Sequence, residues 1–365
     1  MNLELTEEQV ALRETVRRYL SEKASVSAHV RSMLDSPSGT TGEIWHGLAA
    51  LGAVGVLVPE AFGGAGMTMV DAGVVAEELG SALHPGPWLS SAVAATRTLT
   101  RTGADAAELL TGIADGSTIA TVGPLGGTRP VAVDTGDGVV LRGEVAALPD
   151  AAAADVLLIL ADGDKGTGLF AVDAARVAAT PREHVDPTRK LFDVVLDDAP
   201  ARRLASPSAA VIEAVVDDVL TVYAADAVGA AQAVMNLAIE YAKTRRQFDQ
   251  PIGSFQAVQH LCVDMYETVE LARSGVMHAL WAADAADAAE HHLAAARAKS
   301  FAGRLAGAGD IAIQIFGGIG YTWEHDAHLY LKRLLGWSAF LGGTDRYLEE
   351  VGALLATGGD RKDVR

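Results

Sequence analysis

Hydrophobic positions recur at helical spacing in the first third of the chain. Leu12, Val16 and Leu20 lie four residues apart, as on one face of an α-helix. Similar segments continue to about residue 115. The stretch VPEAFGGAGMT at 58–68 interrupts them with three glycines that disfavour a helix. We therefore predict an N-terminal helical domain over residues 1–115 with a surface loop at 58–68.

Short runs rich in Val, Ile and Leu replace this pattern between residues 116 and 204. The runs are STIATV, GVVLRG, DVLLILA, GLFAVD and FDVVLD, and TGDG and ADGDKGTG form turns between them. The connections are too short for helical crossovers, which argues against a parallel dinucleotide-binding sheet. The pattern predicts a small antiparallel β-domain over 116–204.

The helical period returns after residue 205, where it is strongest. Hydrophobic stripes follow the three- and four-residue spacing in two segments: Met235, Ala238, Ile239 and Ala242, then Val258, Leu261, Cys262, Met265, Val269, Ala272 and Val276. Long helices with such narrow stripes are typical of antiparallel bundles. The fold class is α+β and mostly α, with a C-terminal helical bundle over 205–365.

Composition and charge narrow the function classes. The 365 residues are half hydrophobic, with a mean hydropathy of +0.21, so the chain buries a large core in two or three domains. The formal charge of −18 disfavours nucleic acid and membrane surfaces as partners. The acidic start is unlike a signal peptide, and no window of about 18 residues is free of charge. Cys262 is the single cysteine, so a reducing, cytoplasmic location is expected.

Two candidate ligand motifs have simpler interpretations. Adjacent helical residues such as His291 and His292 point about 100° apart and chelate one metal poorly, so we predict a solvated helix face and no metal site. The glycines of QIFGGIGY, Gly317, Gly318 and Gly320, follow a helix rather than a strand. On spacing alone they indicate a helix end and a turn.

A basic cluster is more informative. Lys243, Arg245 and Arg246 end one helix, and Pro251 with Gly253 forces a turn before the next. The arginines either complement the helix dipole or bind a phosphate-bearing ligand through their forked geometry. The residues alone leave these two interpretations equal.

The order helical, β, helical, with VPEAFGGAG, EELG, RRQFDQPIGSFQAVQH and QIFGGIGYTWEHD, resembles the acyl-CoA dehydrogenase family over essentially the whole chain. The resemblance implies a middle β-barrel, a C-terminal four-helix bundle, a tetramer of two dimers and FAD between barrel and bundle. In this family the neighbouring subunit completes the FAD pocket. The residues implied to reach the neighbour's FAD are Arg245, Gln247, Phe248, Ile252 and Gln256, with Gln314, Gly317 and Gly318 as the second half of the same clamp.

The position of the catalytic base departs from the family. Family enzymes remove the Cα proton of the acyl thioester with a Glu while the Cβ hydride passes to flavin. Counting from Arg333, which matches a family arginine, places Gly342 at that Glu. Some members carry the Glu on the first bundle helix; that position is Val219 here. Asp218, one residue away, is a weak alternative because a one-residue shift rotates a side chain by about 100°.

The β-domain departs from the family as well. VGPLGGTR puts Val122 and Gly123 where relatives carry a Thr-Glu pair, although Pro124, Gly127 and Thr128 persist. Ala147, Leu148 and Pro149 replace a Trp-Ile-Thr stretch that lies against the flavin ring. Proline offers neither an N–H nor a hydroxyl to a flavin edge.

These differences favour the small, base-lacking partner of a heteromeric α2β2 acyl-CoA dehydrogenase acting on bulky acyl-CoA substrates such as sterol side chains. A larger dehydrogenase subunit is its expected partner and an electron-transfer flavoprotein its expected electron acceptor. Two alternatives remain: a self-sufficient homotetramer using Asp218 or another acid, and a scaffold without flavin.

Overall fold

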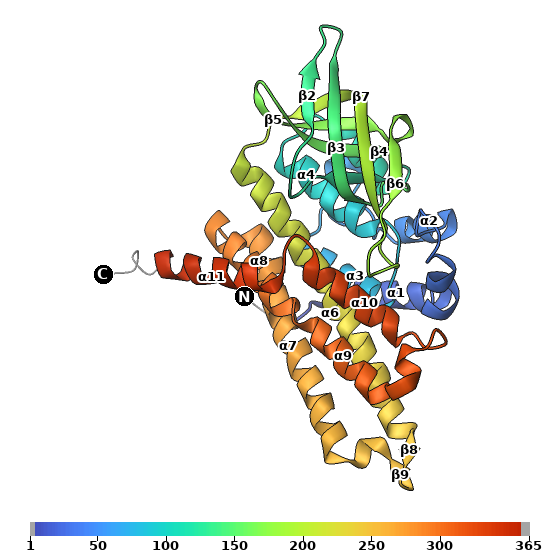
Figure 1. The fold of residues 1–365 in the computed structure, drawn as a ribbon. Helices are drawn as coiled ribbons and strands as arrows, with labels where there is room; N and C mark the ends of the chain where they lie inside the picture. Colours follow the sequence, from blue (N-terminus) through green and yellow to red (C-terminus); the bar gives the residue numbers. More distant parts are fainter. Residues whose placement is uncertain (1–3, 359–365) are drawn as a thin grey trace.

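The computed structural model describes residues 4–358, in which a β-domain stands above a body of helices (Figure 1). Helices form the first part of the chain: α1 (Glu7–Lys23), η1 (Val26–Val30), α2 (Gly42–Ala50), η2 (Glu60–Phe62), α3 (Met69–Ser81), η3 (Leu89–Ala95), α4 (Thr96–Arg101) and α5 (Ala107–Asp115). Thr6 caps the start of α1 with a capping box. Its hydroxyl accepts from the Gln9 N–H, and the Gln9 side-chain Oε1 accepts from the Thr6 N–H. Val16 and Leu20 are buried, as the periodicity predicted.

The glycine-rich segment at 58–68 is a loop with one 3₁₀ turn, as predicted. Gly63 and Gly66 have φ of +83° and +58°, which other residues rarely adopt. A Cβ at Gly64 would lie 2.1 Å from the Val58 carbonyl oxygen, so the loop closes tightly on itself.

Seven strands build the β-domain: β1 (Ala120–Gly123), β2 (Val131–Asp134), β3 (Val139–Pro149), β4 (Val156–Gly163), β5 (Gly166–Asp173), β6 (Ala178–Pro181) and β7 (Leu191–Ala205). The pairings β4–β2, β2–β3, β3–β7, β7–β5 and β5–β4 close a small barrel. Its interior is apolar, with Phe170, Phe192 and Val194 fully or almost fully buried.

The prediction of a purely antiparallel domain was wrong in one respect. β1 and β2 both run parallel to β4, with Ala120 opposite Val156 and Val131 opposite Asp162. The chain between β1 and β4 is long enough for a parallel return because the β2–β3 hairpin lies within it. The short strands β2 and β6 were not predicted; each has four residues, all of them exposed or only half-buried.

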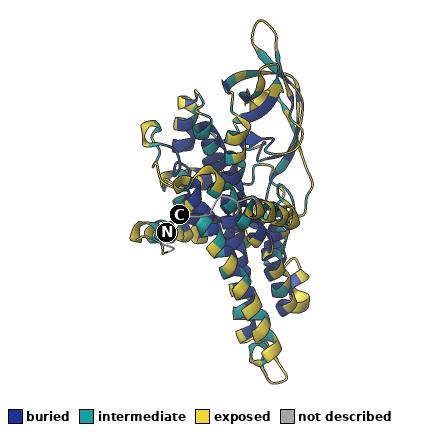
Figure 2. Ribbon diagram, turned by 90° about the vertical axis from the view of Figure 1, so that its left-hand side faces the viewer, coloured by how far each residue is buried: buried dark blue, intermediate teal, exposed yellow. Residues whose placement is uncertain are grey.

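Residues 209–358 contain six α-helices: α6 (Ala209–Thr244), α7 (Gln256–Ala285), α8 (Ala288–Ala302), α9 (Leu305–Phe316), α10 (Ala327–Ala339) and α11 (Thr344–Gly358). Two 3₁₀ turns, η5 (Ile252–Ser254) and η6 (Gly317–Tyr321), follow α6 and α9. α6 to α10 pack on one another, α3 packs on α6, and α11 lies against α8. Met265, Val269 and Ala272 of the predicted stripe are buried, while Val258 and Leu261 are half-buried near the exposed end of α7 (Figure 2). No helix within residues 4–358 combines the length and apolarity needed to cross a lipid bilayer.

Candidate functional site

A hairpin projects from the far end of α6 and α7. Its strands are β8 (Arg246–Gln247) and β9 (Gln250–Pro251), and Phe248 and Asp249 form the two-residue turn with φ of +49° and +63° (Figure 1). Two positive φ values are what a tight hairpin turn requires, but an aromatic residue rarely adopts one. The Phe248 side chain is also 87% exposed. Strained backbone of this kind clusters at functional sites.

The two predicted halves of the clamp come together at this end of the molecule. Tyr241, in the last turn of α6, packs its ring 5.0 Å from that of Phe316, the last residue of α9. Four residues beyond Tyr241 is Arg245, and one residue beyond Phe316 is Gly317. The contact therefore joins the hairpin to the glycine turn, although 72 residues separate Arg245 from Gly317 in the sequence.

The clamp residues present free polar groups. Arg245, Gln247, Gln256 and Gln314 are exposed, and none of their side chains bonds to another residue within 4–358. Neighbouring charges are engaged: Arg246 donates to the Asp249 carbonyl and Lys243 pairs with Glu240 at 2.6 Å. Gly317 has φ +64°, and no heavy atom lies within 4 Å of a Cβ built on Gly317 or Gly318. Ile252 differs, because it is half-buried against the helical core and supports the hairpin.

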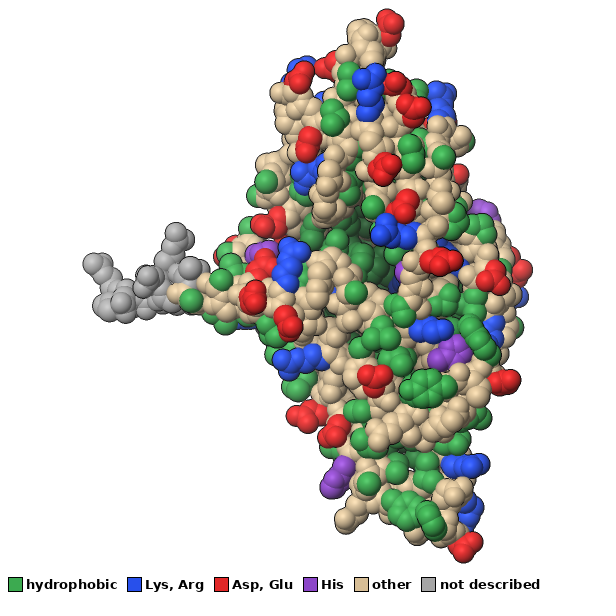
Figure 3. Space-filling view, in the orientation of Figure 1, with side chains coloured by type: hydrophobic (Ala, Val, Ile, Leu, Met, Phe, Trp, Pro, Cys, Tyr) green, Lys and Arg blue, Asp and Glu red, His purple; other side chains and the backbone are tan. Residues whose placement is uncertain are grey.

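A pocket lies between the β-domain and the end of α10. Its volume is about 370 Å³, and its apolar lining is visible as a hollow in Figure 3. Both predicted flavin-ring segments contribute to it: Val122 to Pro124, at the end of β1, and Ala147 to Pro149 of β3. A bulge between Val145 and Leu148 in the β3–β7 pairing directs the second segment toward the pocket.

Polar groups around this pocket are used within the protein. The Ala147 N–H donates to Asp193 Oδ1 at 3.0 Å, and the Thr121 hydroxyl donates to the Pro149 carbonyl at 2.7 Å. The His184 Nε2 atom lies 3.0 Å from the Arg189 carbonyl. These segments therefore offer few hydrogen-bonding groups to a flavin ring, in contrast to the clamp.

Gly342 is fixed in a conformation that suits only glycine. Its φ is +116°, and a Cβ there would approach Arg346 Cδ at 3.1 Å, on α11. The preceding residue, Leu341, is held by Tyr347, whose hydroxyl donates to the Leu341 carbonyl at 2.9 Å. The Leu341 side chain lies against Gly126 across the pocket mouth. The position predicted for the family base thus lacks a carboxylate, and its backbone conformation disfavours any residue with a side chain.

Asp218 is fully buried in an ion cluster, away from solvent. Arg101 Nε lies 2.5 Å and Arg97 Nε 2.6 Å from its Oδ2, and His291 Nε2 lies 3.1 Å from its Oδ1. Burial alone would raise the pKa of Asp218, but the hydrogen bonds of His291 and Arg101 and the charge of Arg97 outweigh it and lower the pKa to about 2. A carboxylate so stabilised is a poor proton acceptor.

The prediction that His291 and His292 form a solvated face was wrong. His291 is buried against Asp218, and His292 bridges Asp217 and Glu350 at 3.0 Å each. The hydrogen bond and charge of Asp217 raise the pKa of His292 to about 9. Asp217 and Asp218 on α6 contact the adjacent residues His292 and His291 on α8. Both pairs can be seen in the sequence, but only the helix packing shows that they meet. Among the described residues no cluster of His, Cys, Asp and Glu could hold a metal ion.

Sequence reasoning missed the central role of Arg333. The guanidinium is buried and donates to Thr188 Oγ1 at 2.9 Å, Asp226 Oδ1 at 3.0 Å and the His84 carbonyl at 3.1 Å. These acceptors come from the β-domain, from α6 and from the segment that follows α3. Lys299 was also missed; its Nζ donates to the Trp337 carbonyl at 2.6 Å and so fixes the end of α10 beside the pocket.

Comparison with known proteins identifies the class. Residues 6–117 match the family described as Acyl-CoA dehydrogenase, N-terminal domain, and residues 221–353 match its C-terminal domain. The acyl-CoA dehydrogenase IpdE2 of Mycobacterium tuberculosis is 35% identical over 331 residues, which are 90% of this chain and 92% of that protein. The chain belongs to the acyl-CoA dehydrogenase family, whose members are oxidoreductases acting on CH–CH groups.

One further relative and two solved structures are also similar to this chain. The acyl-CoA dehydrogenase FadE34 of M. tuberculosis is 38% identical over 98% of this chain, but the chain spans only about half (49%) of that protein. A variant of the Tcur3481–Tcur3483 steroid ACAD has a TM-score of 0.87 and 31% identity, covering 97% of this chain and 99% of that one. The ChsE4–ChsE5 complex of M. tuberculosis has a TM-score of 0.89 and 26% identity over the full length of both chains.

Proposed function

We propose that this chain takes part in the FAD-dependent α,β-dehydrogenation of an acyl-CoA as the subunit that completes a partner chain's FAD site and has no catalytic base of its own. The observation that carries the proposal is the contrast between the clamp and the pocket. The clamp has free polar side chains and bare backbone. The polar groups of the pocket segments are bonded within the protein, and Gly342 stands beside the pocket.

The chemistry of the clamp suits a diphosphate. In the proposed complex FAD supplies the hydride acceptor, and this chain holds its nucleotide end. The unpaired Arg245 guanidinium provides positive charge on a chain of charge −18, while Gln247 and Gln314 provide neutral donors. Gly317 and Gly318 let a phosphate approach the backbone because no side chain intervenes. Phe248 is well placed to contact the partner chain.

A heteromeric α2β2 assembly with a larger dehydrogenase subunit fits these features best. Two similar structures are described as the Tcur3481–Tcur3483 steroid ACAD and the ChsE4–ChsE5 complex, so each name pairs two components. The name of the first supports a bulky, sterol-derived acyl-CoA as substrate. The electron acceptor in this proposal is an electron-transfer flavoprotein.

The alternative of a self-sufficient homotetramer depends on another acid taking the place of Gly342. Asp218 is disfavoured because it is enclosed by two arginines and a histidine. The Asp218→Asn variant separates the two ideas: a base would lose substrate-driven flavin reduction, whereas a structural carboxylate would lose stability.

The flavin-to-chain ratio tests the proposal directly. The full chain is purified alone and after co-expression with a larger acyl-CoA dehydrogenase subunit, and FAD is measured by absorbance after denaturation. We expect a colourless lone chain and one FAD per two chains in the complex. One FAD per chain with turnover in the lone protein would contradict the proposal. Absence of flavin from every complex would favour a scaffold.

A further inference from the structure

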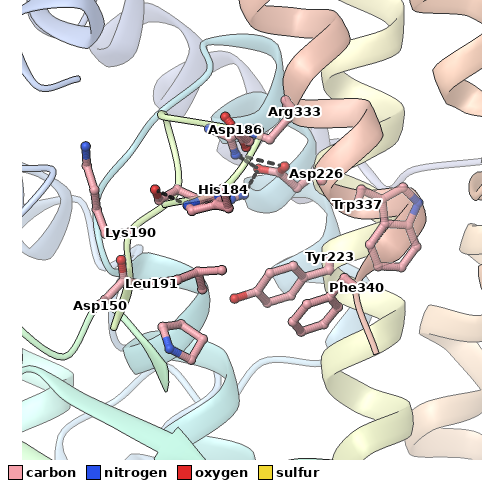
Figure 4. A pocket seen from close by; sticks show the side chains of 13 residues that line it. Asp150, His184, Asp186, Lys190, Leu191, Tyr223, Asp226, Arg333, Trp337 and Phe340 are labelled. Carbon is pink, nitrogen blue, oxygen red and sulfur yellow. Dashed lines mark hydrogen bonds and ion pairs between the residues drawn. The ribbon is translucent and has the colours of Figure 1, made fainter. Parts of the chain in front are cut away.

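A cavity of about 140 Å³ lies where α1 and α3 pack on α6 and α7. Most of its wall is apolar and comes from α3, α6 and α7, with the side chains of Val74, Val228, Val276, Met277 and Leu280. It shares no lining residue with the pocket beside α10 or with the space next to Arg333 in Figure 4. Its occupancy is therefore independent of whether this chain binds a flavin.

One face of α1 is bonded to α3 on both sides of this cavity. Gln9 Nε2 donates to Asp71 Oδ1 at 3.0 Å, and Arg17 donates to the two oxygens of Glu78 at 2.6 Å and 2.9 Å. Arg13 is four residues from each of these donors, on the same face of the helix, and lines the cavity. It makes no hydrogen bond or ion pair with any residue within 4–358, and its Nε is buried. The contact between α1 and α3 therefore contains an unpaired guanidinium at the level of the cavity.

Glu77, the acidic residue that lines the same cavity, is paired with Arg273 of α7. Arg273 also has its Nε 3.3 Å from Glu270 Oε1, and its other terminal nitrogen donates to Gln232 Oε1 at 2.9 Å. All three nitrogens of Arg273 are thus engaged, and the charge of Glu77 is compensated. Among the charged residues that line the cavity in the described structure, Arg13 is left to pair with an anion.

We infer that this cavity binds a small molecule with an apolar body about the size of a benzene ring and one carboxylate, which pairs with Arg13. The size agrees, because an apolar cavity of about 150 Å³ accommodates benzene. A guanidinium presents two parallel N–H groups, which match the two oxygens of a carboxylate. A phosphate dianion would leave further charged oxygens against the apolar wall without donors. Arg13 is half-buried, so its head group can meet a ligand that enters from solvent.

Benzoate and benzyl alcohol are suitable probes because they carry the same ring and differ in charge at neutral pH. Each is titrated into the full chain at pH 7 and constant ionic strength, and binding is followed by saturation-transfer NMR. We expect benzoate to bind about ten-fold more tightly, as one charge-assisted hydrogen-bonded pair allows. In Arg13→Gln this preference should disappear. Arg18→Gln is the matched control, since Arg18 is exposed on the same helix and does not line the cavity.

A second pair of variants locates the bound ring. Ala225→Leu adds volume at the α6 wall of the cavity and should weaken both probes by about ten-fold or more. Ala210→Leu, at an exposed position of the same helix, should leave both affinities unchanged. Circular dichroism checks that each variant is folded. If Ala225→Leu does not fold, Val74→Ile, which adds one methylene at the α3 wall, takes its place.

The outcomes decide the inference separately from the proposed function. Loss of the benzoate preference in Arg13→Gln, together with weaker binding of both probes in the filled cavity, supports it. The inference is overturned if neither probe binds saturably, if the two bind equally to the wild-type chain, or if Arg13→Gln and the filled variant both bind like wild type. None of these results changes the expected flavin content of the lone chain or of the complex.

Discussion

The hairpin clamp and the apolar pocket lie at opposite ends of the helical body, and they differ in whether their polar groups are hydrogen-bonded within the protein. At the clamp, Arg245, Gln247 and Gln314 are exposed without partners in the described structure. At the pocket, Ala147 and Thr121 have their hydrogen-bonding groups bonded internally. A free donor can bind a ligand without first breaking a bond, whereas an internally bonded donor cannot.

The proposed function treats nucleotide binding and dehydrogenation as separable properties of one fold. The clamp depends on two short segments joined by the contact between Tyr241 and Phe316. The pocket is lined by other elements, namely β1, β3 and the end of α10. A chain can therefore lose the second set and keep the first, as an assembly with two kinds of subunit would allow.

The largest expected effect is at Asp218, the alternative candidate for the base on the dehydrogenation side of the comparison. Asp218→Asn leaves Arg97 and Arg101 without their buried partner, so the free energy of unfolding should fall by about 3 kcal/mol or more. Urea denaturation followed by circular dichroism measures it. Asp249→Asn, at an exposed turn, is the control and should have little effect. A stable Asp218→Asn variant with abolished flavin reduction would instead make Asp218 a base and erase the contrast.

The next effect is on the clamp side, at Arg245. Arg245→Ala removes a charge-assisted contact worth about 1.5 to 3 kcal/mol, so FAD retention by the heteromeric complex should fall about ten-fold or more. Flavin release during dilution measures it. Lys243→Ala, two residues before Arg245 in the sequence but paired with Glu240, should retain FAD like wild type. Equal losses in both variants would mean that only net charge matters.

His292 makes the stability of the chain sensitive to pH. Its folded pKa of about 9 exceeds the usual 6.5, so its contribution to stability is complete below pH 6.5 and is lost as pH rises through 9. Allowing for partial exposure, the contribution is about 2 kcal/mol. The stability difference between wild type and His292→Gln should therefore shrink across this range. Buried Lys299, whose pKa is lowered to about 7 by burial, acts in the opposite direction but cancels in the difference. A difference independent of pH would contradict the assignment.

The smallest expected effect concerns Gly342. Gly342→Glu places a side chain at φ +116° and should lower stability by about 1 to 2 kcal/mol without producing substrate reduction. Gly343→Glu is the matched control, because it has no heavy atom within 4 Å of its Cβ and no positive φ. Thermal melts and anaerobic substrate titration measure both properties. Dehydrogenation by the lone Gly342→Glu chain would show that the pocket side had lost nothing except the carboxylate.

The sequence predicted the elements that depend on local periodicity. The stripe from Met265 to Val276 and the glycine loop at 58–68 are set by spacing and backbone preference, which one chain displays in full. The parallel pairing of β1 with β4 was missed because it joins segments separated by a hairpin. Periodicity carries no information about such long-range pairing.

Side-chain partnerships were the least predictable part of the site. Asp218 appeared as a possible base, and its sequestration depends on Arg97 and Arg101 from α4 and His291 from α8. An i, i+4 pair of arginines at 97 and 101 was a usable signal of one charged helix face, yet nothing in the sequence says which helix it meets. The clamp residues were easier to name, because the resemblance of RRQF and QIFGG to family motifs does not depend on packing.

We expect Arg333 to couple the folding and unfolding of three parts of the chain. Its guanidinium draws acceptors from the β-domain, from α6 and from the segment that follows α3. Cutting the chain between any two of these parts would leave the buried Arg333 guanidinium without some of its acceptors. No fragment should therefore retain the native arrangement. The polypeptide should therefore unfold as one cooperative body, and engineering by exchange of whole segments with relatives would have to carry Thr188, Asp226 and Arg333 together.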